Sequence, residues 1–229
     1  MKILLAPSER KSLGGDKEFN IDSFPSLNPI RDETIKKYEE FLQKTNDVKH
    51  FGEDKTPIKK RKAKEAILRY TGVAFEYLDY PSLPKQAKEY LNENLIIFSN
   101  LFGILKPLDL IPHYILKQGS KPGFDIYKFY APHIQKELDS LNEEFIDLRA
   151  KFYEKMYKPK NAITFKFIKN GKVISHFAKA YRGTLTRHIA LNRPKNLDEV
   201  LKIEFPGIKI IEIQEKKGIK EIVCEIIEN

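Results

Sequence analysis

Two short apolar runs, residues 2–6 and 95–98, constrain the fold of this 229-residue chain more than any other feature. A continuous apolar run of about four to eight residues is typical of a buried strand. Neither run approaches the roughly 18 residues of a membrane-spanning helix, and Pro7 ends the first before it reaches the length of a signal peptide. We therefore expect a β-sheet with a buried centre, in a cytoplasmic protein with no membrane contact.

Helical spacing of apolar residues dominates much of the remaining chain. One such pattern begins at Asp32, a second follows Pro84, and a third is expected after Pro132. Residues 64–70 and 179–191 show the same spacing. These segments predict helices that alternate with the strands.

A hairpin signal lies in the second half of the chain. Apolar and polar residues alternate from 163 to 168, and Asn170-Gly171 then leads into residues 173–177, which is a strong turn signal between strands. A further pair of strands is expected at 208–213 and 219–227. No repeat and no linker rich in Gly, Ser or Pro interrupts the sequence. We expect one compact α+β domain over residues 1–229, with a mixed sheet flanked by helices.

Positive charge is concentrated in one segment. The 38 residues from Lys158 to Lys195 contain seven Lys, three Arg and no Asp or Glu, within a chain whose net charge is +9. The rest of the chain has 31 basic and 32 acidic residues. The Lys and Arg side chains of such a stretch repel one another in the folded protein, and a bound polyanion would reduce that repulsion. Nucleic acid is therefore the expected partner, and an acidic membrane surface or simple solubility are the alternatives.

Phosphate contacts with little sequence preference and a steep salt dependence are the expected mode of DNA binding. On the helix expected at 179–191, three cations can share one side, and Gly183 permits close backbone approach. The residues that we expect to line a concave basic cleft are Lys106, Lys158, Lys160, Lys166, Lys172, Lys179, Arg182 and Arg187, with Lys11 nearby. A weaker basic run, residues 55–64, is either a solvated face or a second binding surface.

The polar loop after the first apolar run is the main candidate for chemistry. It carries Ser8, Glu9 and Lys11 without the glycine pattern of a phosphate-binding loop, and it is either an anion site or a charged surface turn. With Asp109, Lys179 and Arg182, these residues would suit an enzyme that acts on a nucleotide or a nucleic-acid end. A narrow pocket joining this loop to Arg182 would favour the enzyme, and a long open basic groove would favour duplex binding.

Other candidate features are less specific. The turn at Gly103 is either a helix-hairpin-helix-like element that meets a DNA phosphate or a packing turn that ends a strand. An aromatic cluster either stacks on bases or belongs to the core, and its members are Phe124, Tyr127, Phe129 and Tyr130. The histidines are scattered singly, and Cys224 is the single cysteine of the chain. We therefore expect no disulfide, no metal site and no cofactor.

Three strings occur in order along the chain, Leu-Phe-Gly-Ile-Leu-Lys-Pro-Leu-Asp-Leu at 101–110, Asp-Ile-Tyr-Lys-Phe at 125–129 and Ser-His-Phe-Ala-Lys-Ala-Tyr-Arg-Gly at 175–183. Together they resemble the peroxide stress protein YaaA family of bacteria. The resemblance covers nearly the whole chain and is weakest between residues 21 and 70. The first loop resembles the variant Pro-Ser-Glu-x-Lys, in which the lysine is offset from that of Ser-Pro-Ala-Lys-Thr in other members.

The resemblance implies both a fold and a function. It implies one compact α+β domain with a positively charged cleft and a helix-hairpin-helix-like element. It also implies a protein that binds DNA, protects it during hydrogen peroxide stress and limits free intracellular iron. Of these properties, DNA binding is also expected from the charge distribution, whereas no residue pattern in the sequence indicates iron binding.

Overall fold

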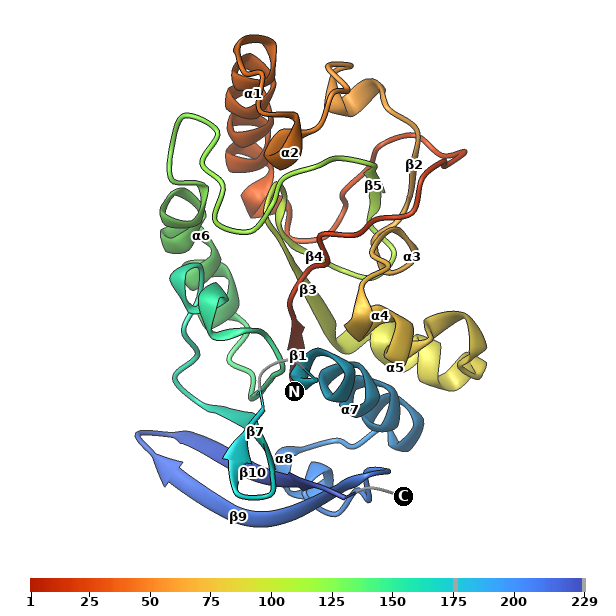
Figure 1. Ribbon diagram of the computed structural model, residues 1–229, viewed down its shortest axis with the longest axis vertical. Helices are drawn as coiled ribbons and strands as arrows, with labels where there is room; N and C mark the ends of the chain where they lie inside the picture. Colours follow the sequence, from red (N-terminus) through yellow and green to blue (C-terminus); the bar gives the residue numbers. More distant parts are fainter. Residues whose placement is uncertain (175–176, 228–229) are drawn as a thin grey trace.

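One mixed sheet forms the centre of the protein, as seen in a computed structural model that describes residues 1–174 and 177–227 (Figure 1). Its strands lie in the order β4-β3-β1-β6-β7-β10-β9, and β8 pairs with β7. Strands β3, β1, β6, β7 and β10 are parallel, whereas β4, β8 and β9 are antiparallel to their neighbours. The strands are β1 (Lys2–Leu5), β3 (Leu95–Ser99), β4 (Gly103–Leu105), β6 (Phe145–Asp147), β7 (Ala162–Lys169), β8 (Lys172–Val173), β9 (Ile208–Lys216) and β10 (Ile219–Ile226). The expected α+β class with a mixed sheet is confirmed.

Helices lie on both sides of this sheet. In Figure 1, α6 lies on one side of β1 and β3, and α4, α5 and α7 lie on the other. The helices are α1 (Asn28–Lys44), α2 (Val48–Phe51), α3 (Ala66–Arg69), α4 (Val73–Leu78), α5 (Lys85–Asn94), α6 (Ile126–Ser140), α7 (Ala178–Asn192) and α8 (Leu197–Val200). Single 3₁₀ turns are η1 (Pro25–Leu27), η2 (Ile58–Lys60), η3 (Tyr80–Ser82) and η4 (Lys151–Lys155), and a small separate sheet pairs β2 (Ala63–Glu65) with β5 (Leu110–Pro112).

The two apolar runs are adjacent strands at the centre of the sheet. Ile3 of β1 pairs with Leu95 of β3 on one side and with Ile146 of β6 on the other. Their side chains are completely buried, so both predicted buried strands are confirmed. Within the described ranges, every helix is too short or too polar to cross a membrane.

The predicted hairpin and the predicted C-terminal strand pair are both present. Asn170 and Gly171 have φ values of 51° and 72°, the left-handed conformation that a tight hairpin turn between twisted strands requires. They connect β7 to β8, which ends at Val173. The expected strand residues Ser175 and His176 lie outside the described residues. Strands β9 and β10 form the expected antiparallel pair.

Of the two interpretations of the turn at Gly103, the structure supports the packing turn and not the helix-hairpin-helix-like element. Gly103 begins β4, which pairs with β3, so the turn joins two strands and not two helices. Its φ of 76° and the ring of Tyr130, which lies 2.8 Å from where a Cβ would stand, explain the need for glycine. The residue therefore serves as the packing turn that was the alternative interpretation.

Two further expectations need correction in their boundaries. The helix expected after Pro132 begins at Ile126, because the Asp125 carboxylate accepts the Lys128 amide N–H at 3.2 Å and caps the helix there. Tyr127 and Tyr130 on this helix are buried, so these members of the aromatic cluster belong to the core. Residues 64–70 form part of β2 followed by the single-turn helix α3.

Close packing of α7 against α4 depends on Gly183, as expected. A Cβ at this position would lie 2.1 Å from the Ala74 carbonyl oxygen and 2.9 Å from the Tyr77 Cβ. Both neighbours are backbone or backbone-proximal atoms, which cannot move without a shift of the whole helix. The two helices can therefore approach this closely only because residue 183 has no side chain.

Gly183→Ala should destabilise the protein by about 1–3 kcal/mol, because the added methyl group separates α7 from α4. The measurement is the thermal midpoint, which should fall by roughly 2–4 °C for each kcal/mol in a chain of this size. Thr184→Ala, which adds no atom to the same helix, serves as the control. A Gly183→Ala midpoint equal to that of the control would contradict the packing argument.

Candidate functional site

A pocket of about 250 Å³ opens at the carboxyl ends of three adjacent parallel strands. Leu5 ends β1, Asn100 follows β3 and Leu148 follows β6, and all three line the pocket. In open sheets of parallel strands, ligands bind outside the carboxyl ends, where neighbouring connections leave in opposite directions. The remaining walls come from the first loop (residues 6–10), from Gly72–Phe75 at the start of α4, from Gln118, Ala150 and Tyr153, and from Lys179 and Arg182 of α7.

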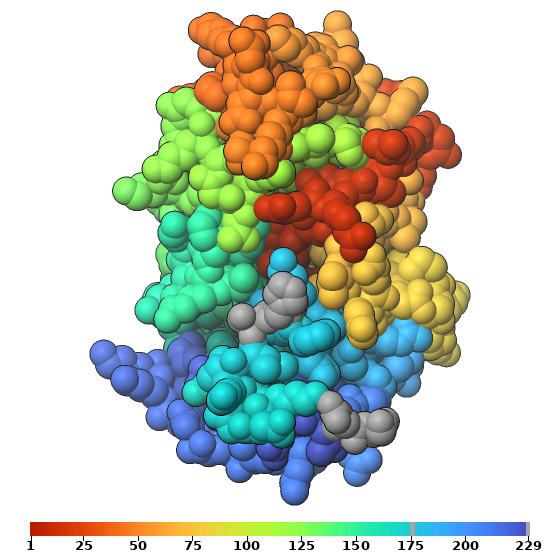
Figure 2. Space-filling model, in the orientation of Figure 1, coloured from red at the N-terminus to blue at the C-terminus, as the bar shows by residue number. Residues whose placement is uncertain are grey.

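The same arrangement is visible on the surface. In Figure 2, the red segment that follows β1 lies next to the gold segment of α4, and the blue segment of α7 meets both from below. Three segments that are distant in sequence thus meet on one face of the molecule.

The first loop is held against the segment that precedes α4. The Arg10 carbonyl oxygen accepts the Thr71 amide N–H at 3.1 Å, and the Ser12 amide N–H donates to the Arg69 carbonyl oxygen at 2.8 Å. Gly72 lies so close to Ser8 that a Cβ there would be 2.1 Å from the Ser8 hydroxyl oxygen. The Ser8 hydroxyl therefore occupies the space of a missing side chain at the edge of the pocket.

Glu9 closes another side of the pocket. One oxygen of its carboxylate accepts the Gln118 amide N–H at 3.2 Å. The next residue, Arg10, forms an ion pair with Glu76 of α4 at 2.6 Å. These two contacts fix the loop to two walls of the pocket and leave the Glu9 carboxylate among its lining residues.

Tyr153 and Asn100 supply polar groups from the floor of the pocket. The Tyr153 hydroxyl donates to the Asn100 side-chain oxygen at 3.0 Å, and the Asn100 amide donates to the Leu116 carbonyl oxygen at 3.0 Å. Burial raises the pKa of Tyr153, so the phenol stays protonated at neutral pH. Below them, the Arg149 guanidinium forms a bidentate pair with Asp147 and lies 4.2 Å from the Phe98 ring centroid.

Lys179 and Arg182 bring positive charge to the pocket from the first turns of α7. They lie three residues apart and therefore on the same face of the helix. Burial lowers the pKa of Arg182 from its ordinary value, although a guanidinium remains charged at neutral pH. The narrow pocket that would join the first loop to Arg182 is thus present.

Lys11 lies behind this loop with its amine against aromatic rings. Its Nζ is 4.2 Å from the Tyr114 ring centroid and 5.6 Å from that of Tyr70. Burial lowers the pKa of Lys11 to about 7, and the Arg69 guanidinium acts in the same direction against the opposing effect of Glu9.

The other expected phosphate contacts are divided between the two edges of the sheet. Lys158 and Lys160 precede β7, at the amino edge, and Lys160 forms an ion pair with Asp139 at 2.9 Å. Lys106 is also at the amino edge, where its amine donates to the Glu93 carbonyl oxygen beside Lys2 and burial lowers its pKa to about 8. None of the three lines the pocket at the carboxyl edge.

The remaining three expected cations, Lys166, Lys172 and Arg187, do not line the pocket either. Lys166 lies within β7, and Lys172 begins β8 after the hairpin turn at the carboxyl end of β7. Arg187 donates to the Leu78 and Asp79 carbonyl oxygens at 3.0 Å and lies 3.6 Å from the Asp79 carboxylate. It therefore joins α7 to the end of α4 and does not line the pocket.

Asp109 is buried away from the pocket. Its carboxylate accepts the Lys106 amide N–H at 2.7 Å, the Ser23 amide N–H at 3.2 Å and the Ser23 hydroxyl. All these donors belong to the loops that surround the turn after β4. The structure therefore brings Ser8, Glu9, Lys179 and Arg182 together and leaves Asp109 outside that group.

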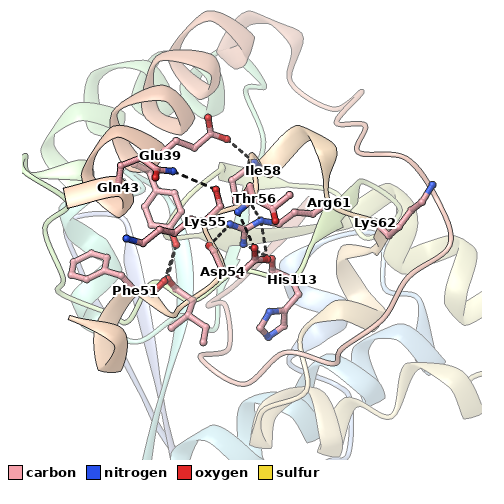
Figure 3. Close-up of polar contacts among 12 residues, drawn as sticks. Glu39, Gln43, Phe51, Asp54, Lys55, Thr56, Ile58, Arg61, Lys62 and His113 are labelled. Atoms are coloured by element: carbon pink, nitrogen blue, oxygen red, sulfur yellow. Dashed lines mark hydrogen bonds and ion pairs between the residues drawn. The ribbon is translucent and has the colours of Figure 1, made fainter. Parts of the chain in front are cut away.

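The second basic run is bound into the fold and to acidic residues. Arg61 is buried, and its guanidinium donates to the Thr56, Asp54 and His113 carbonyl oxygens (Figure 3). Lys59 and Lys62 form ion pairs with Asp32 and Glu18. These contacts favour the solvated-face interpretation over a second binding surface.

Asn100, Gln118 and Tyr153 are pocket residues that sequence reasoning missed. A usable signal existed for Asn100, because it directly follows the buried run 95–98 in the same way that the first loop follows β1. Gln118 belongs to a loop and Tyr153 to the 3₁₀ segment η4, and neither directly follows a buried apolar run. No group of His, Cys, Asp and Glu within the described residues is arranged to hold a metal ion.

The fold and site define a class of α+β proteins in which a basic helix closes a polar pocket at the carboxyl edge of a mixed sheet. Comparison with known sequences assigns the family: residues 1–213 match the model of the peroxide stress protein YaaA family, and the chain belongs to it. An uncharacterized protein of Campylobacter jejuni is 46% identical over the whole of both chains. UPF0246 proteins of Corynebacterium glutamicum and Colwellia psychrerythraea are each 33% identical, over 93% and 86% of this chain and 95% and 82% of their own.

Cys224 should be unreactive toward oxidants and thiol reagents in the folded protein. The side chain is completely buried, and burial raises the pKa of its thiol to about 12, so the reactive thiolate is nearly absent at neutral pH. We expect no labelling by a thiol reagent at pH 8 under native conditions and one labelled thiol per chain in guanidinium. Rapid native labelling, or a mass increase at Cys224 after brief peroxide exposure, would contradict this burial.

Proposed function

We propose that this member of the peroxide stress family binds nucleic acid by seating one nucleotide unit in the pocket. The unit would be a strand end or a base-extruded position, with its phosphate toward Lys179 and Arg182. The observation that carries the proposal is that these two cations and the first loop line one pocket. A volume of about 250 Å³ suits a group of nucleotide size and is too small for a duplex.

A bound strand would leave the pocket along the hairpin that precedes α7, where Lys172 begins β8. Lys166 lies on the face of β7 opposite to Phe167, whose ring stacks on Tyr181 of α7. Among the described residues, no carboxylate forms an ion pair with Lys166, Lys172 or Lys179. Ordinary protein surfaces mix both signs of charge, so an acid-free stretch beside a pocket favours a polyanionic partner.

Protection of DNA under peroxide stress would follow if damaged or unpaired positions are the ones that enter the pocket. Such positions cost less to extrude, because they have already lost pairing or stacking. Limitation of free intracellular iron, which the resemblance implies, stays part of the proposal, and we assign no residue to it.

A second function, catalysis on a nucleotide or nucleic-acid end, is favoured by the narrow pocket that joins the first loop to Arg182, which is the feature expected of an enzyme and not of a groove for a duplex. The carboxylate of Glu9 and the hydroxyl of Ser8 line the same pocket as Lys179 and Arg182. A carboxylate can serve as an acid or base while the neighbouring cations stabilise developing negative charge.

Lys179→Glu/Arg182→Glu should weaken binding to a single-stranded or frayed oligonucleotide by at least about tenfold at low salt, because two phosphate contacts become repulsive. Fluorescence anisotropy across a salt series measures the affinity, and the salt slope should fall by about two in the variant if each residue neutralises one phosphate. Lys160→Glu is the matched control, since Lys160 lies at the opposite edge of the sheet. Equal losses in both variants would place binding outside the pocket.

Glu9→Gln should abolish any turnover of labelled oligonucleotides or nucleotides while leaving their binding nearly intact, because the amide keeps the shape but cannot exchange a proton. Products are followed by chromatography. The control is Glu18→Gln, because Glu18 forms an ion pair with Lys62 and does not line the pocket. Absence of any product with the unaltered protein would reject catalysis, and turnover that survives in Glu9→Gln would reject Glu9 as its acid or base.

A further inference from the structure

The pocket is lined by opposite charges that do not neutralise each other. Lys179 and Arg182 line it from α7, and Glu9 lines it from the first loop, which meets α7 from another side (Figure 2). Within residues 1–174 and 177–227, neither the Glu9 carboxylate nor either cation takes part in an ion pair. Such a site suits a ligand with an anionic end and, at its other end, hydrogen-bond donors that a carboxylate can accept.

Most of the hydrogen-bonding capacity of the Glu9 carboxylate is unused. One of its oxygens accepts the Gln118 amide N–H at 3.2 Å. The nearby Lys11 amine donates to the Glu9 backbone carbonyl oxygen at 3.3 Å and not to the carboxylate. An ionised carboxylate can accept about four hydrogen bonds. The Gln118 contact therefore holds the group in place and leaves acceptor sites for a ligand.

The Gln118 side chain adds a donor to the same wall. It is exposed, lines the pocket and forms no hydrogen bond among the residues that the structure describes. Because the Glu9 carboxylate lies against the Gln118 backbone, the two side chains present an amide donor and a set of charged acceptors next to each other.

The four bases differ in what they can present to this wall. Guanine has two adjacent N–H donors, at N1 and N2, with the acceptor O6 beside them on its Watson–Crick edge. Adenine and cytosine place one amino donor beside an unprotonated ring nitrogen, which a carboxylate repels, and thymine places one N–H between two carbonyl groups. Proteins that extrude a base read it at this edge. Guanine alone matches a carboxylate that has an amide donor at its side.

We propose that the pocket selects guanine, an assignment that rests on the nucleotide binding proposed above. The Glu9 carboxylate accepts the N1–H and N2–H groups, and the Gln118 amide donates to O6. Repulsion by Glu9 directs the phosphate away from this wall, toward Lys179 and Arg182. The apolar lining residues that can pack against the faces of the base are Pro7, Val73, Ala74, Phe75, Leu148 and Ala150.

Binding of probes that differ in one base tests the selection. Labelled duplexes, identical except for one unpaired nucleotide, are titrated at low salt with the full chain and followed by fluorescence anisotropy. The unpaired base is guanine, adenine, cytosine, thymine or hypoxanthine, which is guanine without its N2 amino group. Guanine should bind at least about fivefold more tightly than each other base, the discrimination expected from a bidentate contact. Equal affinities for all five probes would overturn the assignment.

Substitution of Glu9 tests which group reads the base. In Glu9→Ala, the ratio of guanine to adenine affinity should fall from at least about fivefold to about one, because the carboxylate acceptors are gone. Glu9→Gln keeps one acceptor oxygen and should give an intermediate ratio. Both affinities are measured on one preparation, so a loss of folded protein lowers both and leaves their ratio unchanged. Glu18→Ala is the control, since Glu18 does not line the pocket. An undiminished ratio in Glu9→Ala would overturn the role of Glu9.

A second arm distinguishes guanine in a nucleic acid from guanine in a free nucleotide. Guanosine 5′-monophosphate and adenosine 5′-monophosphate are each titrated into the protein and followed by calorimetry. A guanine preference among the duplexes supports the nucleic-acid source. A preference among the mononucleotides with no duplex bound supports the selection of guanine but rejects the nucleic acid as its source. Binding without any base preference overturns only the selection, whereas binding of no probe at all rejects the proposed nucleotide site.

Discussion

Burial of β1 between β3 and β6 is the constraint on which the rest of the structure depends. Ile3 pairs with Leu95 on one side and Ile146 on the other, and the removal of these apolar side chains from water is the main favourable contribution to folding at this point. Because the three strands are parallel, their carboxyl ends meet at one edge. The first loop, Asn100 and Leu148 are brought together there although they are far apart in the sequence.

Short sequence patterns correctly predicted the elements that depend mainly on residues close to one another in the chain. The apolar runs, the Asn170-Gly171 turn and the helical spacing after residue 178 each predicted an element that is present. Gly183 was identified as a point of close approach, although its partner, the Ala74 carbonyl oxygen, depends on how α4 packs. The first loop was recognised as a candidate site because polar residues directly follow a buried strand.

The place of each cation in the structure depends on strand pairing between segments that are distant in the sequence, and the sequence alone did not show that pairing. Lys160 and Lys179 belong to one acid-free segment, yet β7 separates them and places them at opposite edges of the sheet. The distribution of charge along the chain therefore predicted a positive segment but not the surface on which each cation lies. The turn at Gly103 kept two interpretations for a related reason, since the sequence did not show that β4 pairs with β3.

The pocket walls come from six separate stretches of chain, between Leu5 and Arg182, that meet only when the sheet is complete. A partly synthesised or partly unfolded chain has no binding surface of this kind, because the last wall is provided by α7. Occupancy of the pocket would therefore stabilise the whole native state over every incomplete one. The resistance of the folded protein to proteolysis would then rise with the concentration of whatever ligand fills the pocket.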